Sequence, residues 1–271
     1  MRVVDLHTHS SCSDGTSSPS DVARQVAKRR AALFALTDHD SVEGVEEAGR
    51  TAESLGVAFV TGVEISAREH DHLHILGYHI DLENPALRAF LEKHRGSRRE
   101  RVRKCVEALS RAGVPVTFEE VCALAGKTLS RAHIADLLRS KGLASSRQTA
   151  FSKFLVPGMP GYVPPQGASF EEAVSVIRGA GGLAVLAHPG AVRDIWDFPR
   201  WVSAGLGGLE AYYATHTVTL TRELLDIASR YGLAVTAGSD YHGPKSGRSK
   251  NTGIALADED CELMLRSVAG I

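Results

Sequence analysis

Short apolar runs alternate with longer amphipathic stretches along most of the chain, a pattern typical of parallel strands joined by helices. The apolar runs predict strands at residues 3–9, 32–36, 57–63, 72–79, 183–187, 208–213 and 233–237. Between these runs, amphipathic stretches that open near Ser18, Val42, Ser169 and Leu220 predict helices. The sequence therefore predicts an α/β fold whose strands end in polar, chemically active residues.

The alternation stops after His79 and resumes only at Leu183, an interval too long for one crossover between neighbouring strands. Within it, residues 87–112 predict one long basic helix, the pair Thr117 and Glu120 forms a capping box that opens a second, and residues 130–138 predict a third. We expect a helical insertion at residues 99–165 that forms part of the substrate pocket. The main domain is then discontinuous, at residues 1–98 and 166–271.

Composition excludes several classes of protein. Lys and Arg total 31 against 32 Asp and Glu, a net charge of −1 with 43% hydrophobic residues, which is ordinary for a globular domain and offers no general nucleic-acid surface. The four cysteines are far apart and form no CxxC pair, which favours reduced thiols and a cytoplasmic location. We expect no membrane span, because no run of about 18 apolar residues is present.

Histidines and carboxylates gather at the predicted strand ends. His7 and His9 are two residues apart, so both side chains leave the same face of one strand, and Asp240 and His242 repeat this spacing. In a barrel of parallel strands the carboxyl ends meet at one mouth, so ligands scattered along the chain can meet in space. The expected metal ligands are His7, His9, Asp14, His39, Glu64, His74, His188, Asp240 and His242.

This donor set contains imidazole and carboxylate but no thiolate, which suits Mn²⁺, Fe²⁺ or Zn²⁺. Nine ligands exceed the needs of one ion, and sharing Glu64 would let two ions lie about 3.5–4 Å apart, with ligands left for a third. Three divalent ions facing three carboxylates leave the site at about +2 by charge counting, even with a bridging hydroxide. We expect Mn²⁺, with Fe²⁺ or Zn²⁺ as alternatives, and a multiply charged anion such as phosphate as the ligand.

The motifs around these residues make the interpretation specific. The segments DLHTHS (5–10), SDG (13–15), TDHD (37–40), GVE (62–64), HILG (74–77), AHP (187–189) and GSDYH (238–242) resemble those of the PHP (polymerase and histidinol phosphatase) family. The resemblance implies a distorted TIM-like (βα)7 barrel with a trinuclear metal site. It assigns His7, His9, Glu64 and Asp240 to the first metal, Glu64, His74 and His188 to the second, and Asp14, His39 and His242 to the third.

Three further segments resemble the family's stand-alone phosphoesterases, which dephosphorylate nucleotides such as 3′,5′-bisphosphates or trim short 5′-phosphorylated RNA. These segments are SRAHIA (130–135), GYVP (161–164) and GLEAYYATH (208–216). We expect hydrolysis of nucleotide phosphate monoesters, of a 3′,5′-nucleoside bisphosphate or an AMP-like nucleotide, by a hydroxide that bridges two metals. The expected catalytic residues are Asp240, Arg131 as a bidentate phosphate clamp, and His216 as proton donor to the leaving oxygen. His133 and Lys153 are further substrate-binding candidates.

Several alternatives stay open. A 5′-3′ exoribonuclease acting on short 5′-phosphorylated RNA would use the same metals, and histidinol-phosphate phosphatase, amidohydrolase and a non-catalytic metal-stabilised interaction module are the others. The basic run from Arg95 to Lys104 is interleaved with glutamates, which favours a solvated helix face over an RNA-binding one. Asp5, Asp38 and Asp40 are candidates to orient the ligand imidazoles, and Asp40 is equally a candidate to cap the helix that follows it. We expect a small phosphorylated substrate and no obligate protein partner.

Overall fold

The computed structural model describes residues 1–249 and 251–269. Within these ranges eight strands form one sheet in the order β7-β6-β5-β4-β3-β2-β1-β8. The strands are β1 (Arg2–Asp5), β2 (Ala31–Leu36), β3 (Ala58–Ser66), β4 (His74–Tyr78), β5 (Leu183–Leu186), β6 (Gly208–Tyr213), β7 (Ala234–Gly238) and β8 (Ile254–Leu256). The seven strands expected from the sequence are all present.

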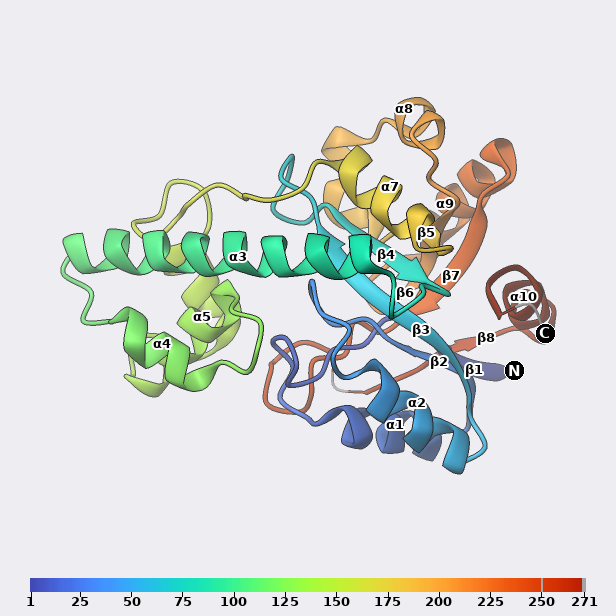
Figure 1. The fold of residues 1–271 in the computed structure, drawn as a ribbon, viewed down its shortest axis with the longest axis horizontal. Coiled ribbons are helices and arrows are strands. Elements are labelled where there is room, and N and C mark those ends of the chain that lie inside the picture. The colour runs from blue at the N-terminus through green and yellow to red at the C-terminus, as the bar shows by residue number, and fades with distance from the viewer. Residues whose placement is uncertain (250, 270–271) are drawn as a thin grey trace.

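The sheet curls into a nearly closed barrel, because the segment after β1 bonds to the segment at the end of β7. The backbone N–H of Leu6 donates to the carbonyl of Ala237 at 2.9 Å, and that of Asp240 donates to the carbonyl of His7 at 2.8 Å. Figure 1 shows α1 (Pro19–Lys28) and α2 (Val45–Ser54) on one side of the sheet and α7 (Phe170–Gly179), α8 (Phe198–Ser203) and α9 (Val218–Tyr231) on the other. The TIM-like α/β barrel is confirmed.

Strand β4 departs from the parallel arrangement that the sequence analysis assumes. It runs antiparallel to both β3 and β5, with Ser66 opposite His74. The expectation that His74 lies near the carboxyl end of a strand is therefore wrong, because His74 is the first residue of β4. Because β4 is reversed, its beginning lies beside the carboxyl ends of β3 and β5, and His74 still reaches the same mouth.

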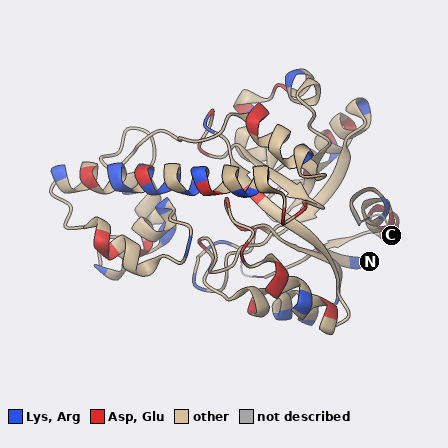
Figure 2. Ribbon diagram, in the orientation of Figure 1, with Lys and Arg blue, Asp and Glu red and all other residues tan. Residues whose placement is uncertain are grey.

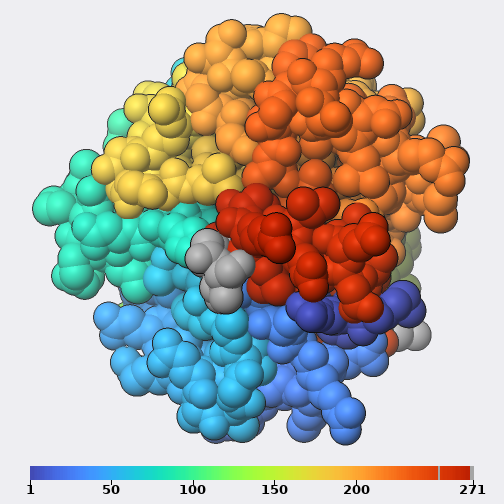
Figure 3. All heavy atoms as spheres, turned by 90° about the vertical axis from the view of Figure 1, so that its right-hand side faces the viewer, coloured from blue at the N-terminus to red at the C-terminus, as the bar shows by residue number. Residues whose placement is uncertain are grey.

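The helix boundaries follow the expected capping chemistry. Ser18 caps α1 by accepting from the backbone N–H of Asp21, and Ser169 forms a capping box with Glu172 at the start of α7. Strand β8, helix α10 (Asp258–Met264) and the π-helical turn Leu265–Ala269 are not foreseen by the sequence analysis. Figure 3 shows this C-terminal segment across one end of the barrel, where β8 pairs antiparallel with β1.

The insertion is built on α3 (Pro85–Arg111), with α4 (Phe118–Leu124), α5 (Arg131–Ser140), α6 (Arg147–Ala150) and a π-helical turn at Phe151–Leu155. It has its own apolar core, formed among others by Val102, Cys105, Leu109, Ile134, Leu138 and Leu155. The earlier part of α3 instead packs on the barrel through Leu87 and Leu91. The boundary expected at residues 98 and 99 thus falls inside one continuous helix, which carries the insertion away from the barrel (Figure 1).

Three observations bear on the expectations about a membrane span, a nucleic-acid surface and the thiols. Across residues 1–249 and 251–269, no helix is long and apolar enough to cross a membrane. The long helix α3 carries charges of both signs along its length (Figure 2). All four cysteines are free.

Candidate metal centre

The structure brings all nine expected ligands together at one mouth of the barrel. Eight of them are buried and His74 is partly buried. They come from the segments that follow β1, β2, β5 and β7, from β3, and from the first residue of β4. The fold therefore brings the expected ligands to one mouth, as the strand-end pattern predicts, although they are spread from residue 7 to residue 242.

Glu64 lies at the centre of the cluster. Its two oxygens lie within 3.3 Å of ring nitrogens of five histidines: Nε2 of His7 (3.3 Å), His9 (3.2 Å) and His188 (3.2 Å), and Nδ1 of His39 (2.9 Å) and His74 (2.9 Å). A carboxylate surrounded by imidazoles on both oxygens has the geometry expected of a ligand shared between ions. The expectation that Glu64 is shared is consistent with this placement.

Four overlapping groups of side chains have ligand atoms within 4.8 Å of one another. They are His9, Asp14, His39 and His242; His7, His9 and Asp240; His7, Glu64 and His188; and His39, Glu64 and His74. Two sets of the family assignment are largely preserved, since His7, His9 and Asp240 stand together, as do Asp14, His39 and His242, which His9 joins. The expected set of Glu64, His74 and His188 is divided, because Glu64 stands with His7 and His188 in one group and with His39 and His74 in another.

The polar atoms of this cluster fit metal ions because many have no other partner. Eight buried side-chain atoms on seven of these residues accept or donate no hydrogen bond within the described chain: His7 Nε2, both ring nitrogens of His9, Asp14 Oδ1, His39 Nδ1, Glu64 Oε2, His188 Nδ1 and Asp240 Oδ1. Buried polar groups without partners are costly and rare in native proteins. Divalent ions bound by these atoms would remove that cost.

The charge state of the carboxylates also suits cations. Burial by itself raises the pKa of Glu64, but the surrounding imidazoles outweigh it and hold the pKa well below its usual value. The same balance, with His242 as the main favourable neighbour, keeps the pKa of Asp14 well below its usual value. For Asp240, burial is outweighed chiefly by Arg248, so its pKa is also well below normal. A lowered pKa favours the ionised carboxylate, which is the form that binds a cation.

Glu210 is a site residue that the sequence analysis does not single out. It is fully buried within β6, its Oε1 lies 3.1 Å from Nδ1 of His7, and its Oε2 accepts the backbone N–H of His188 at 2.8 Å. A carboxylate on the far nitrogen of a ligand imidazole fixes the tautomer and the orientation of the ring. The available sign in the sequence is one acid inside an otherwise apolar strand, since a buried Glu needs a partner.

Asp240 is held in a similar way. Its Oδ2 accepts from the hydroxyl of Tyr213 at 2.8 Å and from Nη1 of Arg248 at 2.8 Å. Its other oxygen, Oδ1, lies 3.2 Å from Nε2 of His9 and has no hydrogen-bond partner within the described chain. One oxygen is thus fixed by the protein while the other faces the ligand cluster.

The three aspartates expected to orient imidazoles have other partners. Asp5 accepts from the backbone and hydroxyl of Ser239, at 2.9 and 2.7 Å, and burial raises its pKa to about 6. Asp38 accepts from the backbone and hydroxyl of Ser10 at 2.7 and 2.5 Å. Asp40 pairs with Arg98 and does not cap α2. These aspartates therefore fix the loops that carry the ligands, not the imidazole rings.

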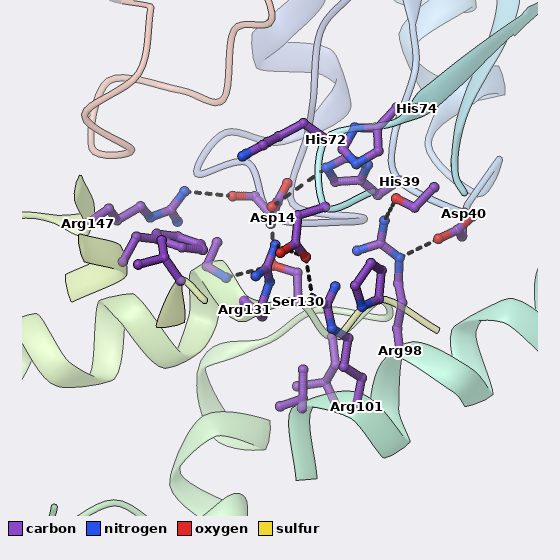
Figure 4. Close-up of a pocket in the computed structure, with 18 of the residues that line it drawn as sticks. Asp14, His39, Asp40, His72, His74, Arg98, Arg101, Ser130, Arg131 and Arg147 are labelled. Atoms are coloured by element: carbon purple, nitrogen blue, oxygen red, sulfur yellow. Dashed lines mark hydrogen bonds and ion pairs between the residues drawn. The ribbon is translucent and has the colours of Figure 1, made fainter. Parts of the chain in front are cut away.

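A cavity of about 530 Å³ joins the ligand cluster to the insertion. Asp14, His39 and His74 line it from the barrel, and Arg98, Arg101 and Arg131 line it from α3 and α5 (Figure 4). Arg131 Nη2 lies 3.0 Å from Asp71 Oδ1, which also pairs with Arg101, and Arg98 donates to Ser66 Oγ at 2.6 Å. The interpretation of the basic run as a solvated face is therefore wrong for Arg98 and Arg101, which α3 turns inward.

The other substrate candidates lie elsewhere. The ring of His216 is occupied on both sides, because Nδ1 bonds the carbonyl of Ala211 at 3.0 Å and Nε2 accepts from the N–H of Gly190 at 3.3 Å. Burial lowers its pKa, so the neutral form is favoured, and the ring does not line the cavity. His133 Nδ1 accepts from the backbone of Ser130 in a capping box. Lys153 is exposed on the π-helical turn and outside the cavity lining.

Comparison with known proteins identifies the family. The model of the PHP domain matches residues 5–146. A 3′,5′-nucleoside bisphosphate phosphatase of Chromobacterium violaceum is 40% identical over 258 residues, covering 91% of this chain and 90% of that protein. A 5′-3′ exoribonuclease of Salmonella typhimurium is 34% identical over 259 residues, covering 89% of this chain and 86% of the relative.

Two solved structures are similar over almost the whole chain. One is described as an amidohydrolase from Chromobacterium violaceum with bound sulfate and no metal, with a TM-score of 0.86, 37% identity and coverage of 97% of this chain and 96% of that one. The other is described as a metal-dependent phosphoesterase from Bifidobacterium adolescentis, with a TM-score of 0.85, 31% identity and coverage of 97% and 95%. The chain belongs to the PHP family of metal-dependent phosphoesterases.

Proposed function

We propose that the protein is a phosphatase that removes one phosphate from a nucleoside 3′,5′-bisphosphate. In this proposal the nine clustered ligands hold three divalent ions, and Mn²⁺ is the first choice of ion. The observation that carries this proposal is the cavity, which offers two kinds of centre for anions. One is the ligand cluster, and the other is the group of guanidinium side chains of Arg98, Arg101 and Arg131, of which Arg98 adjoins the cluster through its contacts with Asp40 and Ser66. A substrate with two phosphates would use both centres.

Charge counting supports an anion at the arginine end. Asp40 neutralises Arg98, and Asp71 faces both Arg101 and Arg131, so this wall has three guanidinium groups for two carboxylates. Guanidinium groups bind phosphate through paired, charge-assisted hydrogen bonds. The volume of about 530 Å³ lies in the usual range for small-ligand sites, roughly 300–1,000 Å³.

The division of labour follows from these positions. When bound, the ions supply Lewis acidity and an activated water for attack on phosphorus. Glu210 and Tyr213 hold His7 and Asp240 in place from outside the cluster. Arg131 orients the distal phosphate, so the scissile phosphate is presented to the cluster in one direction.

Among the alternatives, the 5′-3′ exoribonuclease keeps the most support, because a relative with 34% identity has that activity. Such an enzyme would bind the next nucleotide of a chain where the proposal places the distal phosphate. The histidinol-phosphate, amidohydrolase and binding-module hypotheses have no feature of this cavity in their favour over a nucleotide. The cytoplasmic location and the lack of an obligate protein partner stay predictions.

The test is phosphate release by the Mn²⁺-loaded protein from adenosine 3′,5′-bisphosphate, AMP, histidinol phosphate and a 5′-phosphorylated RNA pentamer. We expect fast release from the bisphosphate that disappears in His39→Ala. Stepwise shortening of the pentamer with little turnover of the bisphosphate would establish the exonuclease instead. Metal binding without turnover of any of the four would support a binding module.

A further inference from the structure

The insertion contacts one of the expected metal ligands directly. Asp14 lies in the loop after β1, while Ser130 and Arg147 belong to the insertion, more than a hundred residues later. Ser130 Oγ donates to Asp14 Oδ2 at 3.2 Å, and Arg147 Nη1 donates to the backbone carbonyl of Asp14 at 3.2 Å (Figure 4). The side chain and the main chain of this one residue are thus held from the insertion.

The hydrogen bond from Ser130 leaves available the oxygen of Asp14 that faces the ligand cluster. Oδ2 of Asp14 is taken by Ser130, whereas Oδ1 has no hydrogen-bond partner within the described chain and lies 3.2 Å from Nε2 of His242. The carboxylate therefore cannot rotate without breaking the Ser130 contact. Its free oxygen is aimed at the group formed with His9, His39 and His242.

Ser130 is itself fixed by the helix that it begins. Its hydroxyl oxygen accepts from the N–H of Ala132 at 3.1 Å as the N-cap of α5, which leaves its single hydrogen for Asp14. Arg147 is fixed by Asp136 of α5, to which Nε and Nη2 donate at 2.8 and 2.5 Å. Both donors are buried, at 6% and 8% exposure.

The loop and the insertion also fit closely beside this contact. A Cβ atom at Gly126 would lie 2.2 Å from the carbonyl oxygen of Ser11, so only glycine allows the insertion to sit this close to the loop of Asp14. Lys127, next to it, pairs with Glu43 of the barrel. The insertion therefore packs directly against the loop of Asp14, in addition to lining the cavity.

We infer that Ser130 and Arg147 are positioning residues that set the affinity of the metal subsite formed by Asp14, His39 and His242, which makes the insertion part of the metal centre. This inference rests on the proposed function in that it needs a bound ion at that subsite. Because Arg131 follows Ser130 on the same first turn, the residue that meets the distal phosphate and the residue that holds Asp14 move together.

The test is Mn²⁺ binding, measured by calorimetric titration of protein stripped of metal, without any substrate. We expect Ser130→Ala and Arg147→Gln to weaken one class of Mn²⁺ site by about 10–100-fold, the usual cost of losing a partner of a metal ligand. Ser130→Thr keeps both the cap and the donor, so it should restore binding. Matched controls are Ser140→Ala and Arg139→Gln on α5, of which Arg139 shares Asp136 but does not contact Asp14.

A second arm separates positioning from loss of structure. In an Asp14→Ala background the subsite is already lost, so Ser130→Ala should cause no further change in Mn²⁺ affinity. An equal loss in both backgrounds, or unchanged binding in Ser130→Ala and Arg147→Gln while Asp14→Ala weakens it, would overturn the inference. If Ser130→Ala does not fold, Arg147→Gln decides alone. A wild-type protein that binds no divalent ion overturns the proposed function as well.

Discussion

Glu210 holds His7 by its outer nitrogen, with Oε1 of the carboxylate 3.1 Å from Nδ1 of the ring, deep in a fully buried position. The inner nitrogen, Nε2, is thereby turned toward Glu64 and Asp240, at 3.3 and 3.5 Å. A single contact thus fixes both the direction of the ring and the nitrogen that is free to bind an ion.

Replacing Glu210 with Gln should weaken Mn²⁺ binding by about 10–100-fold, because a neutral amide is a weaker acceptor for the Nδ1–H of His7 than the carboxylate and orients the ring less firmly. Calorimetric titration of the stripped protein measures this directly. Glu223→Gln is the matched control, since Glu223 forms an exposed ion pair with Arg193 far from the cluster. Equal affinities in the wild type and Glu210→Gln would refute the role of this carboxylate.

His216→Asn should leave the shape of the pH–rate profile unchanged, in contrast to what a proton donor would do. Both ring nitrogens bond to the backbone of Ala211 and Gly190, so the side chain fixes a turn. We expect a loss of stability of about 1–3 kcal/mol, the usual worth of two hydrogen bonds. Rates measured between about pH 5 and 9 check this, and disappearance of one limb of the profile would restore the proton-donor role.

His133 should make the stability of the insertion sensitive to acid. Burial lowers the pKa of His133 below its ordinary value of 6.5, and its Nδ1 must stay unprotonated to accept from Ser130. As the pH falls, the unfolded chain takes up this proton first. The stabilisation is therefore complete above the unfolded value and is lost as the pH falls through the lower folded value.

His133→Gln keeps an acceptor at this position of the capping box but does not titrate. Between about pH 7 and 5, the wild type should therefore lose more free energy of unfolding than the variant. Urea unfolding in the presence of a chelator measures the difference without a contribution from metal release. Parallel losses in the two proteins would show that His133 is not the titrating group.

Removing metal should lower the melting temperature. A ligand present at about 100 times its Kd stabilises a protein by about 2.7 kcal/mol, which corresponds to roughly 5–10 °C for a chain of this size. Thermal unfolding with Mn²⁺ and with EDTA gives the comparison. In His39→Ala the difference should shrink, whereas identical melting of wild type in both conditions would contradict a metal role for the unpartnered atoms.

The clustering of the nine expected ligands could be predicted because short-range spacing and strand ends are visible in a sequence. The direction of β4 does not follow from its pattern, since alternation of apolar and polar residues carries no direction. The segment 67–73 between Ser66 and His74 is too short for a crossover helix, which was a readable sign of an antiparallel pair.

The residues that hold the expected ligands from outside the cluster are harder to predict, because they depend on tertiary contacts. Glu210 acts on His7 and His188 only after the barrel closes, and Ser130 reaches Asp14 only when the insertion docks. His94, Arg98 and Arg101 follow one another at spacings of about one helical turn, and His94 is buried. This spacing marks the inward face of α3 in the sequence, although glutamates are interleaved in the same run.

The most direct test of the two-centre cavity is the ratio of kcat/KM for adenosine 3′,5′-bisphosphate to that for AMP, in the wild type and in Arg131→Met. Loss of a charge-assisted contact to the distal phosphate should lower kcat/KM for the bisphosphate by about 10–150-fold and leave AMP within a few-fold. Lys153→Met, an exposed cation outside the cavity, is the control and should change neither value. A ratio that stays the same in Arg131→Met would contradict the account.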